Sequence, residues 1–292
     1  MAHKHDIETL FKSEDYASSF KRGEMVTRTF AELLVDQSKV AAESKANPNR
    51  PLVILDNACG TGVVSNALNT QLDGIVKKKC KLTCGDISSA MLAHTAHRLQ
   101  QEGWENVETK IVDAQKPDLP SNHYSHIFSG FAYMALPESI KALDETVRML
   151  QPGGTIAFST WIEPGWIPIA RRAIESMPGN LPFPETQKVI SAWSDGEWYS
   201  KPWIESQLKE RGFQDVDVRV TKNELILPCP IFVDMTMLVL PTMMKSFWTE
   251  KQREESEDKV RSAIEKYLKD TFKDGIMETE WVALLSTARK SC

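Results

Sequence analysis

The first half of the chain repeats one pattern of apolar and polar positions. Short apolar runs, typical of parallel strands buried on both faces, alternate with stretches whose apolar residues recur every three to four positions, typical of helices. The run Leu52–Leu55 is the first of these strands. This alternation predicts an α/β fold with a mostly parallel sheet and right-handed crossovers. The expected strands are 52–55, 80–85, 107–112, 125–131 and 155–161, and the expected helices are 63–71, 88–101 and 138–150.

Both ends of the chain depart from this pattern. Helical spacing covers Asp6–Ala42, but Tyr16–Val26 is more polar and predicts either a turn or a mobile lid. The region after Trp161 is rich in proline and tryptophan and predicts an irregular cap. After the cap we expect a helix at 204–211, a strand at 215–227, a helical insertion at 229–272 and a last strand at 281–288. The two strands are expected to pair as an antiparallel edge. We therefore expect a single domain, 1–292, with an N-terminal helical lid (1–50), a core (51–161), a cap (162–203) and a C-terminal part (204–292).

The charge and composition exclude some classes of function. The 292 residues include 35 Lys and Arg and 40 Asp and Glu, a formal net charge of −5 at pH 7. Nucleic-acid-binding proteins usually carry a basic stripe, and none is found. No apolar run approaches the ~18 residues of a membrane span, and Met1–Asp6 lacks the apolar core of a secretory signal. We expect a cytoplasmic protein, a monomer or weak homodimer, whose partner is a small molecule and not a nucleic acid or a membrane.

The five cysteines form no CxxC pair. Cys80 and Cys84 share one face of an expected strand, which makes a metal pair conceivable, but no further ligand types cluster around them. Reduced thiols are the better interpretation, and no metal site is expected.

The segment Asp56–Gly62, Asp-Asn-Ala-Cys-Gly-Thr-Gly, carries the most information about chemistry. Glycines at 60 and 62 let a ligand approach the backbone closely, and the next helix offers unpaired amides to an anionic group. A dinucleotide turn has a third glycine, where this chain has Val63–Ser65. A carboxylate at 56 would repel a pyrophosphate and attract an ammonium or sulfonium group. The pattern favours S-adenosylmethionine over a dinucleotide, and the alternative is an ordinary strand-to-helix turn.

Two further carboxylates close the second and third expected strands. Asp86 is placed to accept both hydroxyl groups of a ribose, with a helix N-cap as its alternative role. Both roles are compatible if Ser88 caps the helix instead. Asp113, followed by Ala114, is placed to bind an adenine amino group, and its alternative is a solvated loop position.

These motifs together resemble the class I S-adenosylmethionine-dependent methyltransferases. The matching residues are Leu55–Gly62, Asp86, Asp113–Ala114 and the Leu-Gln-Pro-Gly-Gly of Leu150–Gly154. The resemblance covers about 52–161 and implies a Rossmann-like, seven-stranded, mostly parallel sheet flanked by helices, with an antiparallel last strand and helical lid and cap insertions. Within the class the layout is similar to fungal small-molecule methyltransferases of secondary metabolism, including those that S-methylate dithiols of the gliotoxin type.

The resemblance also implies roles for particular residues. Gly60 and Gly62 would lie against the methionine part of the cofactor, with Asp56 near its amino group. Many members have glycine where this chain has Ala58, and alanine is tolerated there if its backbone angle is ordinary. The expected cofactor-binding residues are Tyr16, Phe20 and Thr27 of the lid (or residues of ordinary helix packing), Asp56, Ala58, Gly60 and Gly62 of the first motif, Asp86, Ile87 and Met91 around the ribose and adenine, Asp113 and Ala114, and Ser129 and Gly130 at the end of the fourth strand.

The acceptor side offers aromatic residues and no evident base. We expect Phe131, Tyr133, Trp161 and Trp166 to line the substrate pocket, although cap tryptophans also serve simply to pack the cap on the sheet. None of the six histidines falls at the carboxyl edge of the expected sheet, so the only further candidate bases are the cap residues Glu163, Asp195 and Glu197. Because a thiol can react without a base, S-methylation of a small hydrophobic metabolite is favoured. O- or N-methylation, a cofactor-binding enzyme that transfers no methyl group, and a non-enzymatic binding protein are the alternatives.

Overall fold

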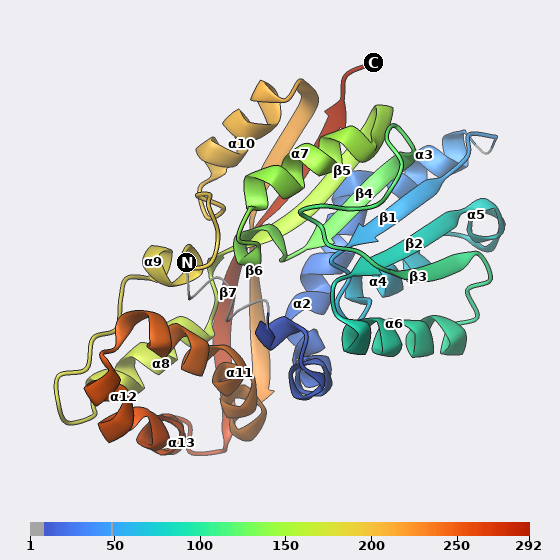
Figure 1. Ribbon diagram of the computed structural model, residues 1–292. Helices are drawn as coiled ribbons and strands as arrows, with labels where there is room; N and C mark the ends of the chain where they lie inside the picture. Colours follow the sequence, from blue (N-terminus) through green and yellow to red (C-terminus); the bar gives the residue numbers. More distant parts are fainter. Residues whose placement is uncertain (1–8, 48) are drawn as a thin grey trace.

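The computed structural model describes residues 9–47 and 49–292. A central sheet carries helices on both faces, and a cluster of helices lies at one end of it (Figure 1). The sheet has seven strands in the order β3-β2-β1-β4-β5-β7-β6. β1 to β5 pair in parallel, and β7 runs antiparallel to both of its neighbours. The strands are β1 (Val53–Asn57), β2 (Lys81–Asp86), β3 (Val107–Ile111), β4 (Tyr124–Gly130), β5 (Leu150–Glu163), β6 (Phe213–Pro228) and β7 (Ile276–Lys290).

This arrangement confirms the predicted fold class, including the antiparallel last strand. The continuous apolar run of β1 is buried because helices cover both faces of the sheet, and Ile54 and Leu55 are fully enclosed. The crossover helices are α4 (Val63–Gln71), α5 (Gly74–Lys79), α6 (Ser89–Gln101) and α7 (Ser139–Met149). The short α5 was not predicted, since none of its residues is buried and it gives no apolar pattern; an Asp73 cap and three lysines in its last turn complete it.

The N-terminal region forms one long helix, α2 (Glu14–Ser38), followed by α3 (Val40–Ala46). The interpretation of 16–26 as a turn is therefore wrong. Ser13 caps α2, and inside the polar stretch Tyr16 and Ala17 bury their side chains against Met91 of α6, which gives this segment an apolar face after all. Asp6, Ile7 and Glu8 of the expected helix lie outside the described residues.

The cap and the C-terminal insertion pack together as a helical cluster with its own apolar core. Long strands β6 and β7 extend out of the sheet to carry it (Figure 1), because Asn223–Pro228 stays paired with Ile276–Trp281 beyond the main core. No helix in the described part of the chain is long and apolar enough to cross a bilayer. The helices after β5 are α8 (Trp166–Glu175), α9 (Thr186–Ile190), α10 (Lys201–Glu210), α11 (Cys229–Phe247), α12 (Glu250–Ser256) and α13 (Val260–Thr271).

Candidate active site

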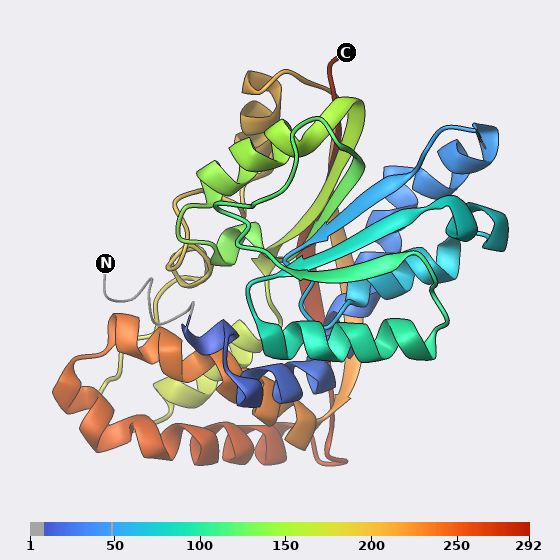
Figure 2. The same ribbon diagram turned by 45° about the vertical axis from the view of Figure 1, so that its right-hand side comes forward.

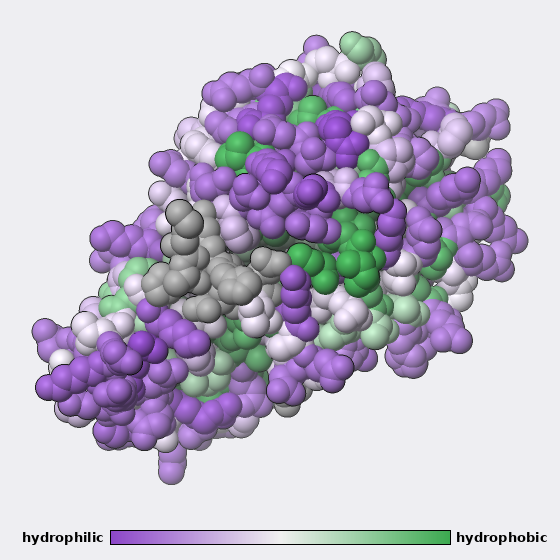
Figure 3. Space-filling model, viewed as in Figure 1, coloured by the Kyte–Doolittle hydropathy of each residue, from purple (hydrophilic) through white to green (hydrophobic). Residues whose placement is uncertain are grey.

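A cavity of about 300 Å³ opens at the carboxyl ends of β1 to β5, where ligands bind in open α/β sheets. The first turns of α2 cross it between α6 and the helical cluster (Figure 2). Apolar side chains gather near the centre of the face that Figure 3 shows, over the ends of the parallel strands. Of the expected site residues, the cavity is lined by Tyr16, Phe20, Thr27, Asp56, Ala58, Gly60, Asp86, Ile87, Met91, Asp113, Ala114, Gly130, Phe131, Trp161 and Trp166.

The loop after β1, residues 58–62, which we call the glycine loop, is fixed by hydrogen bonds to β2 and to α6. The amide of Cys59 donates to the carbonyl of Gly85 at 3.0 Å, and Thr95 of α6 donates to the carbonyl of Gly60 at 2.7 Å. Gly62 has φ +80°, and a Cβ there would come 3.1 Å from the methyl group of Thr95. Gly62 thus allows the loop to pack on α6 and does not itself line the cavity, which differs from its expected contact with the cofactor.

An alanine at position 58 was expected to be tolerated only if its backbone angle is ordinary, and that condition is not met. The φ of Ala58 is +55°, in the left-handed region, where a residue with a Cβ is strained by about 1–2 kcal/mol. The alanine in place of the family's glycine therefore costs stability at this turn.

Replacing Ala58 with glycine should raise the thermal midpoint by a few degrees. The strain energy that is removed exceeds the free-energy cost of the greater conformational entropy of glycine in the unfolded chain. The free energy of unfolding should therefore rise by about 0.5–1 kcal/mol. Differential scanning calorimetry checks this, with Ala67→Gly in the middle of α4 as the control that should lower the midpoint. A lower midpoint for Ala58→Gly would show that the turn tolerates alanine without strain.

Asp86 lies at the end of β2 with both carboxylate oxygens anchored. Oδ2 accepts from the amide of Gly60 at 2.8 Å, and Oδ1 accepts from the amide of Ser88 at 2.9 Å. Burial raises the pKa of this carboxyl, although the amide hydrogen bonds act in the opposite direction. A carboxylate has about four lone-pair sites, so Asp86 can still accept a hydrogen bond from a ligand hydroxyl. Ser88 caps α6 through the amide of Met91, so Asp86 is not required as the cap.

Asp56, at the end of β1, is fully buried and only half satisfied. Its Oδ2 accepts from the amide and the hydroxyl of Ser65 at 3.0 and 2.6 Å, whereas Oδ1 has no hydrogen-bond partner in the described part of the chain. Burial raises the pKa of Asp56 to about 6, and the nearby Asp86 carboxylate adds to the effect. A buried acceptor without a donor beside a cavity fits a ligand that brings a cationic donor.

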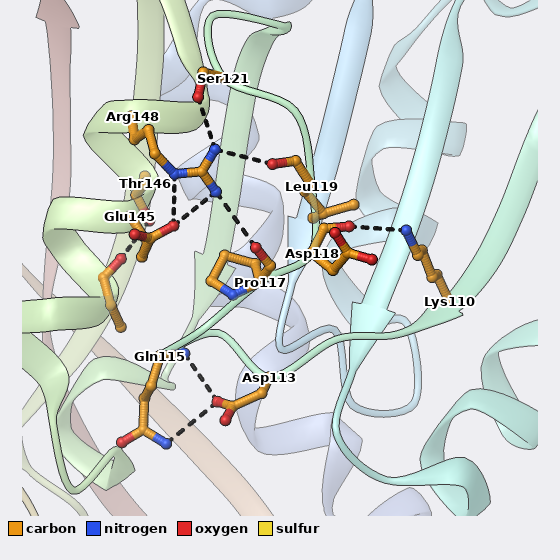
Figure 4. A network of polar contacts seen from close by, with 11 residues as sticks. Lys110, Asp113, Gln115, Pro117, Asp118, Leu119, Ser121, Glu145, Thr146 and Arg148 are labelled. Carbon is orange, nitrogen blue, oxygen red and sulfur yellow. Dashed lines mark hydrogen bonds and ion pairs between the residues drawn. The ribbon is translucent and has the colours of Figure 1, made fainter.

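The loop after β3 contributes Asp113, Ala114 and Gln115 to the wall of the cavity. Asp113 Oδ1 accepts from the amide of Gln115 at 2.9 Å and from its side chain at 3.3 Å, and Gln115 in turn accepts from the amide of Glu138. Arg148 of α7 binds the carbonyls of Leu119 and Pro117 farther along the same loop (Figure 4). The helix behind the sheet therefore holds the loop in which Asp113 and Ala114 face the cavity.

Tyr16, Phe20 and Thr27 of α2 contribute to the cavity opposite the ends of the strands, and Phe20 lies against the loop that contains Gly60. The rings of Tyr16 and Phe20 stack with centroids 5.7 Å apart, and a Cβ on Gly60 would lie 3.8 Å from Phe20. Thr27 bonds its hydroxyl to the carbonyl of Glu24 one turn earlier. All three residues line the cavity, so helix packing and a ligand-facing position coexist in α2.

The part of the cavity at the ends of β4 and β5 and under the cap is aromatic and apolar. Phe131, Trp161 and Trp166 line it as expected. Tyr133 does not: its ring is buried against Trp198 at 4.7 Å, and its hydroxyl bonds Thr146 at 2.8 Å, so it belongs to the core. Ser129 is likewise buried within β4 and outside the lining. The lining residues that were not predicted include Met134, Ala135, Leu136, Pro137, Pro164, Val189, Ile190, Trp193 and Val239.

These missed residues come from the 3-10 turn after β4, the cap and α11. Their apolar character was visible in the sequence, but which cap residues face the sheet depends on how the helical cluster folds back on it. Trp193 belongs to the tryptophan-rich segment that the sequence analysis predicts to form the cap. Val239 lies in an almost uniformly apolar helix, which gave no signal for a pocket.

None of the three carboxylates proposed as bases in the cap reaches the cavity. Glu163 and Glu197 are exposed, and Asp195 accepts from the amides of Ser139 and Ile140 at the start of α7. In the described lining there is no histidine, lysine, arginine or glutamate. Its carboxylates are Asp56 and Asp86, at the ends of β1 and β2, and Asp113, after β3. The thiol of Cys59, also in the lining, has its pKa raised by its hydrogen bond with Cys84 and by burial, so it stays neutral.

Comparison with known proteins supports the same conclusion as this geometry. Residues 54–154 match the model of the family described as "Methyltransferase domain". The chain is 40% identical over 290 residues, 99% of both chains, to an acetylaranotin bis-thiomethyltransferase of Aspergillus terreus. It is 37% identical to the methyltransferase tpcH of Aspergillus fumigatus, over 97% of this chain and 99% of the relative.

Solved structures with the same fold are more distant in sequence. The [4+2]-cyclase SpnF superposes with a TM-score of 0.51 at 15% identity, over 90% of this chain and 80% of that one. The carbon methyltransferase of CurJ gives 0.51 at 13% identity, over 89% and 54%. The half of the cavity formed by β1 to β3 fits S-adenosylmethionine through the carboxylate of Asp86, the half-satisfied Asp56 and the glycine loop. The chain is a member of the S-adenosylmethionine-dependent methyltransferase family.

Proposed function

We propose that this protein methylates a thiol of a small, neutral, largely apolar metabolite. The observation that carries the proposal is the part of the cavity at the ends of β4 and β5 and under the cap, which we call the acceptor half. Its described lining holds no side chain able to take a proton from an acceptor. Its walls are Phe131, Trp161, Trp166 and Trp193, with aliphatic residues of the cap and α11 between them.

The absence of a base in that lining discriminates between nucleophiles. S-adenosylmethionine would supply a methyl group bound to a sulfonium sulfur. The acceptor would bond to the methyl carbon as the carbon–sulfur bond breaks, and the electron pair of that bond would leave with the sulfur as the neutral thioether S-adenosylhomocysteine. A thiol with a pKa of about 8.5 ionises in solution near neutral pH, whereas a phenol near 10 or an alcohol requires a base at the site. An amine reaches the site largely as a cation, and apolar walls without a carboxylate disfavour the burial of that charge. The protein's part is to align and desolvate the two reactants.

The similarity to a bis-thiomethyltransferase supports the same nucleophile. The likeness extends over 99% of both chains and so includes the cap and the helical cluster as well as the cofactor half. A substrate with two thiol groups is therefore the acceptor class to examine first.

The pH dependence of turnover with different thiols tests this proposal. With S-adenosylmethionine saturating, kcat/KM for each thiol should rise about tenfold per pH unit up to that thiol's own pKa and then level. Aromatic and aliphatic thiols should then give profiles displaced by the difference between their pKa values. Glu163→Gln and Glu197→Gln, at carboxylates outside the cavity, should give unchanged profiles.

A profile whose midpoint stays the same for every thiol would assign the ionisation to a group on the enzyme and overturn the proposal. Faster turnover of phenols or amines than of thiols of similar size would also contradict it. Binding of the cofactor without methylation of any acceptor would favour a non-transferring enzyme.

A further inference from the structure

Phe131, the first residue after β4, has a backbone conformation that large side chains rarely adopt. Its φ is +55°, and for a bulky residue this is an outlier that the surrounding structure must hold in place. The amide of Phe131 donates to both the carbonyl and the hydroxyl of Ser159, at 3.0 and 3.1 Å. Ser159 is itself buried in the neighbouring strand β5. The outlier is therefore fixed by two hydrogen bonds from a rigid part of the sheet.

This conformation places the Phe131 ring in an aromatic cluster. The ring stacks on Trp161 with centroids 3.9 Å apart and planes 16° from parallel. Phe30 of α2 meets both rings edge-on, at 5.7 and 5.3 Å, and Trp281 lies 5.3 Å from Trp161. Phe131 and Trp161 line the cavity, whereas Phe30 and Trp281 are buried behind them. We call Phe131 and Trp161 the aromatic stack.

The aromatic stack lies where the two halves of the cavity meet. Asp56 and Asp86 lie at the ends of β1 and β2 and Asp113 follows β3, whereas the acceptor half is formed by the end of β5 and by the cap. β4 lies between β1 and β5 in the sheet. An in-line displacement requires the bond from sulfur to methyl to point from the first half into the second. The sulfonium must then lie near the boundary, at the end of β4.

The boundary has no carboxylate to stabilise that cation. The described lining residues from β4 and the start of its loop are Gly130, Phe131 and Ala132, and Trp161 follows from β5. Among the side chains of these residues, the aromatic ring faces are the groups that attract a cation. We propose that the aromatic stack recognises the sulfonium, so that the protein distinguishes S-adenosylmethionine from its neutral product S-adenosylhomocysteine. The sulfonium charge is lost on methyl transfer, so S-adenosylhomocysteine lacks this interaction with the aromatic stack and is released more readily.

The ratio of the two affinities tests this inference without any turnover. Isothermal titration calorimetry of Phe131→Leu should show about 5- to 30-fold weaker binding of S-adenosylmethionine, with binding of S-adenosylhomocysteine changed less than about twofold, because only the former carries the sulfonium. Phe30→Leu is the matched control, since it removes a ring from the same cluster but not from the cavity lining. It should lower stability and leave the ratio unchanged.

Fluorinated phenylalanines incorporated at 131 provide a second series that keeps the shape of the ring. Each added fluorine withdraws charge from the ring face, so the affinity for S-adenosylmethionine should fall stepwise while that for S-adenosylhomocysteine stays level. Equal losses for both ligands, or no dependence on fluorination, would overturn the proposal and leave the stack a packing feature. Since the ratio is independent of the acceptor, these results stand whether or not the acceptor is a thiol.

Discussion

Replacing Asp86 with alanine should weaken the binding of S-adenosylmethionine by about 10- to 100-fold. A hydrogen bond to a charged group contributes about 1.5–3 kcal/mol, and this buried carboxylate is the group at the end of β2 that can accept ribose hydroxyls. The change also frees the amides of Gly60 and Ser88, which Asp86 now holds at 2.8 and 2.9 Å. Isothermal titration calorimetry measures the loss directly.

Glu102→Ala is the matched control for this substitution. Glu102 also accepts two hydrogen bonds, from Asn66 at 2.7 Å and Asn69 at 3.0 Å, but it lies outside the cavity. Its loss should lower stability without changing the affinity for the cofactor. Unchanged affinity in Asp86→Ala would mean that the ribose does not lie at the end of β2.

Acidification should weaken the binding of S-adenosylmethionine through Asp56. Burial raises the pKa of this carboxyl to about 6 in the free protein, and a bound cation would lower it. Below pH 6 the binding of the cofactor must therefore expel a proton, so the affinity should fall by up to about tenfold per pH unit. Above about pH 7 it should level. Calorimetric titrations between pH 5 and 8 measure this dependence.

Asp56→Asn separates this carboxyl from other titrating groups. The variant keeps the shape but carries no charge, so it should bind more weakly at pH 8 and lose most of the slope between pH 5 and 7. Because the folded-state pKa is raised, the same group stabilises the ligand-free fold at low pH, and this contribution is lost as the pH rises through about 6. A slope as steep in Asp56→Asn as in the parent protein would assign the proton to another group.

The parallel core and most of the cofactor half could be predicted from the sequence, because both depend on local patterns. Asp56 and Asp86 lie at the ends of β1 and β2 and Asp113 lies just after β3, and the carboxyl ends of these strands meet at one edge of a parallel sheet. A helix boundary such as Val63–Gln71 follows from the same pattern and is confirmed residue for residue. The pairing of the last two strands was also predicted, although β7 is longer than its apolar segment because paired polar residues extend it.

The remaining features depend on contacts between distant segments. The ring of Tyr133 faces the core because it stacks on Trp198 and its hydroxyl is hydrogen-bonded to Thr146. Nothing near position 133 in the sequence indicates this. The left-handed angles of Ala58 and Phe131 are imposed by the loop and by Ser159 and are not visible in the residue types. The acceptor walls depend on the docking of the cap, so their apolar chemistry was predicted but several of their members were not.

The transfer of an isotopically labelled methyl group from S-adenosylmethionine to a small dithiol is the decisive test of thiol methylation by this protein. The products are resolved by mass spectrometry with S-adenosylhomocysteine counted in parallel, and phenol and amine acceptors of similar size are run beside the dithiol. We predict label on sulfur, one S-adenosylhomocysteine for each methyl transferred, and loss of this activity in Asp86→Ala at limiting cofactor. Label on oxygen or nitrogen alone would contradict the assignment of the acceptor, and the absence of both label and S-adenosylhomocysteine with every acceptor would contradict methyl transfer itself.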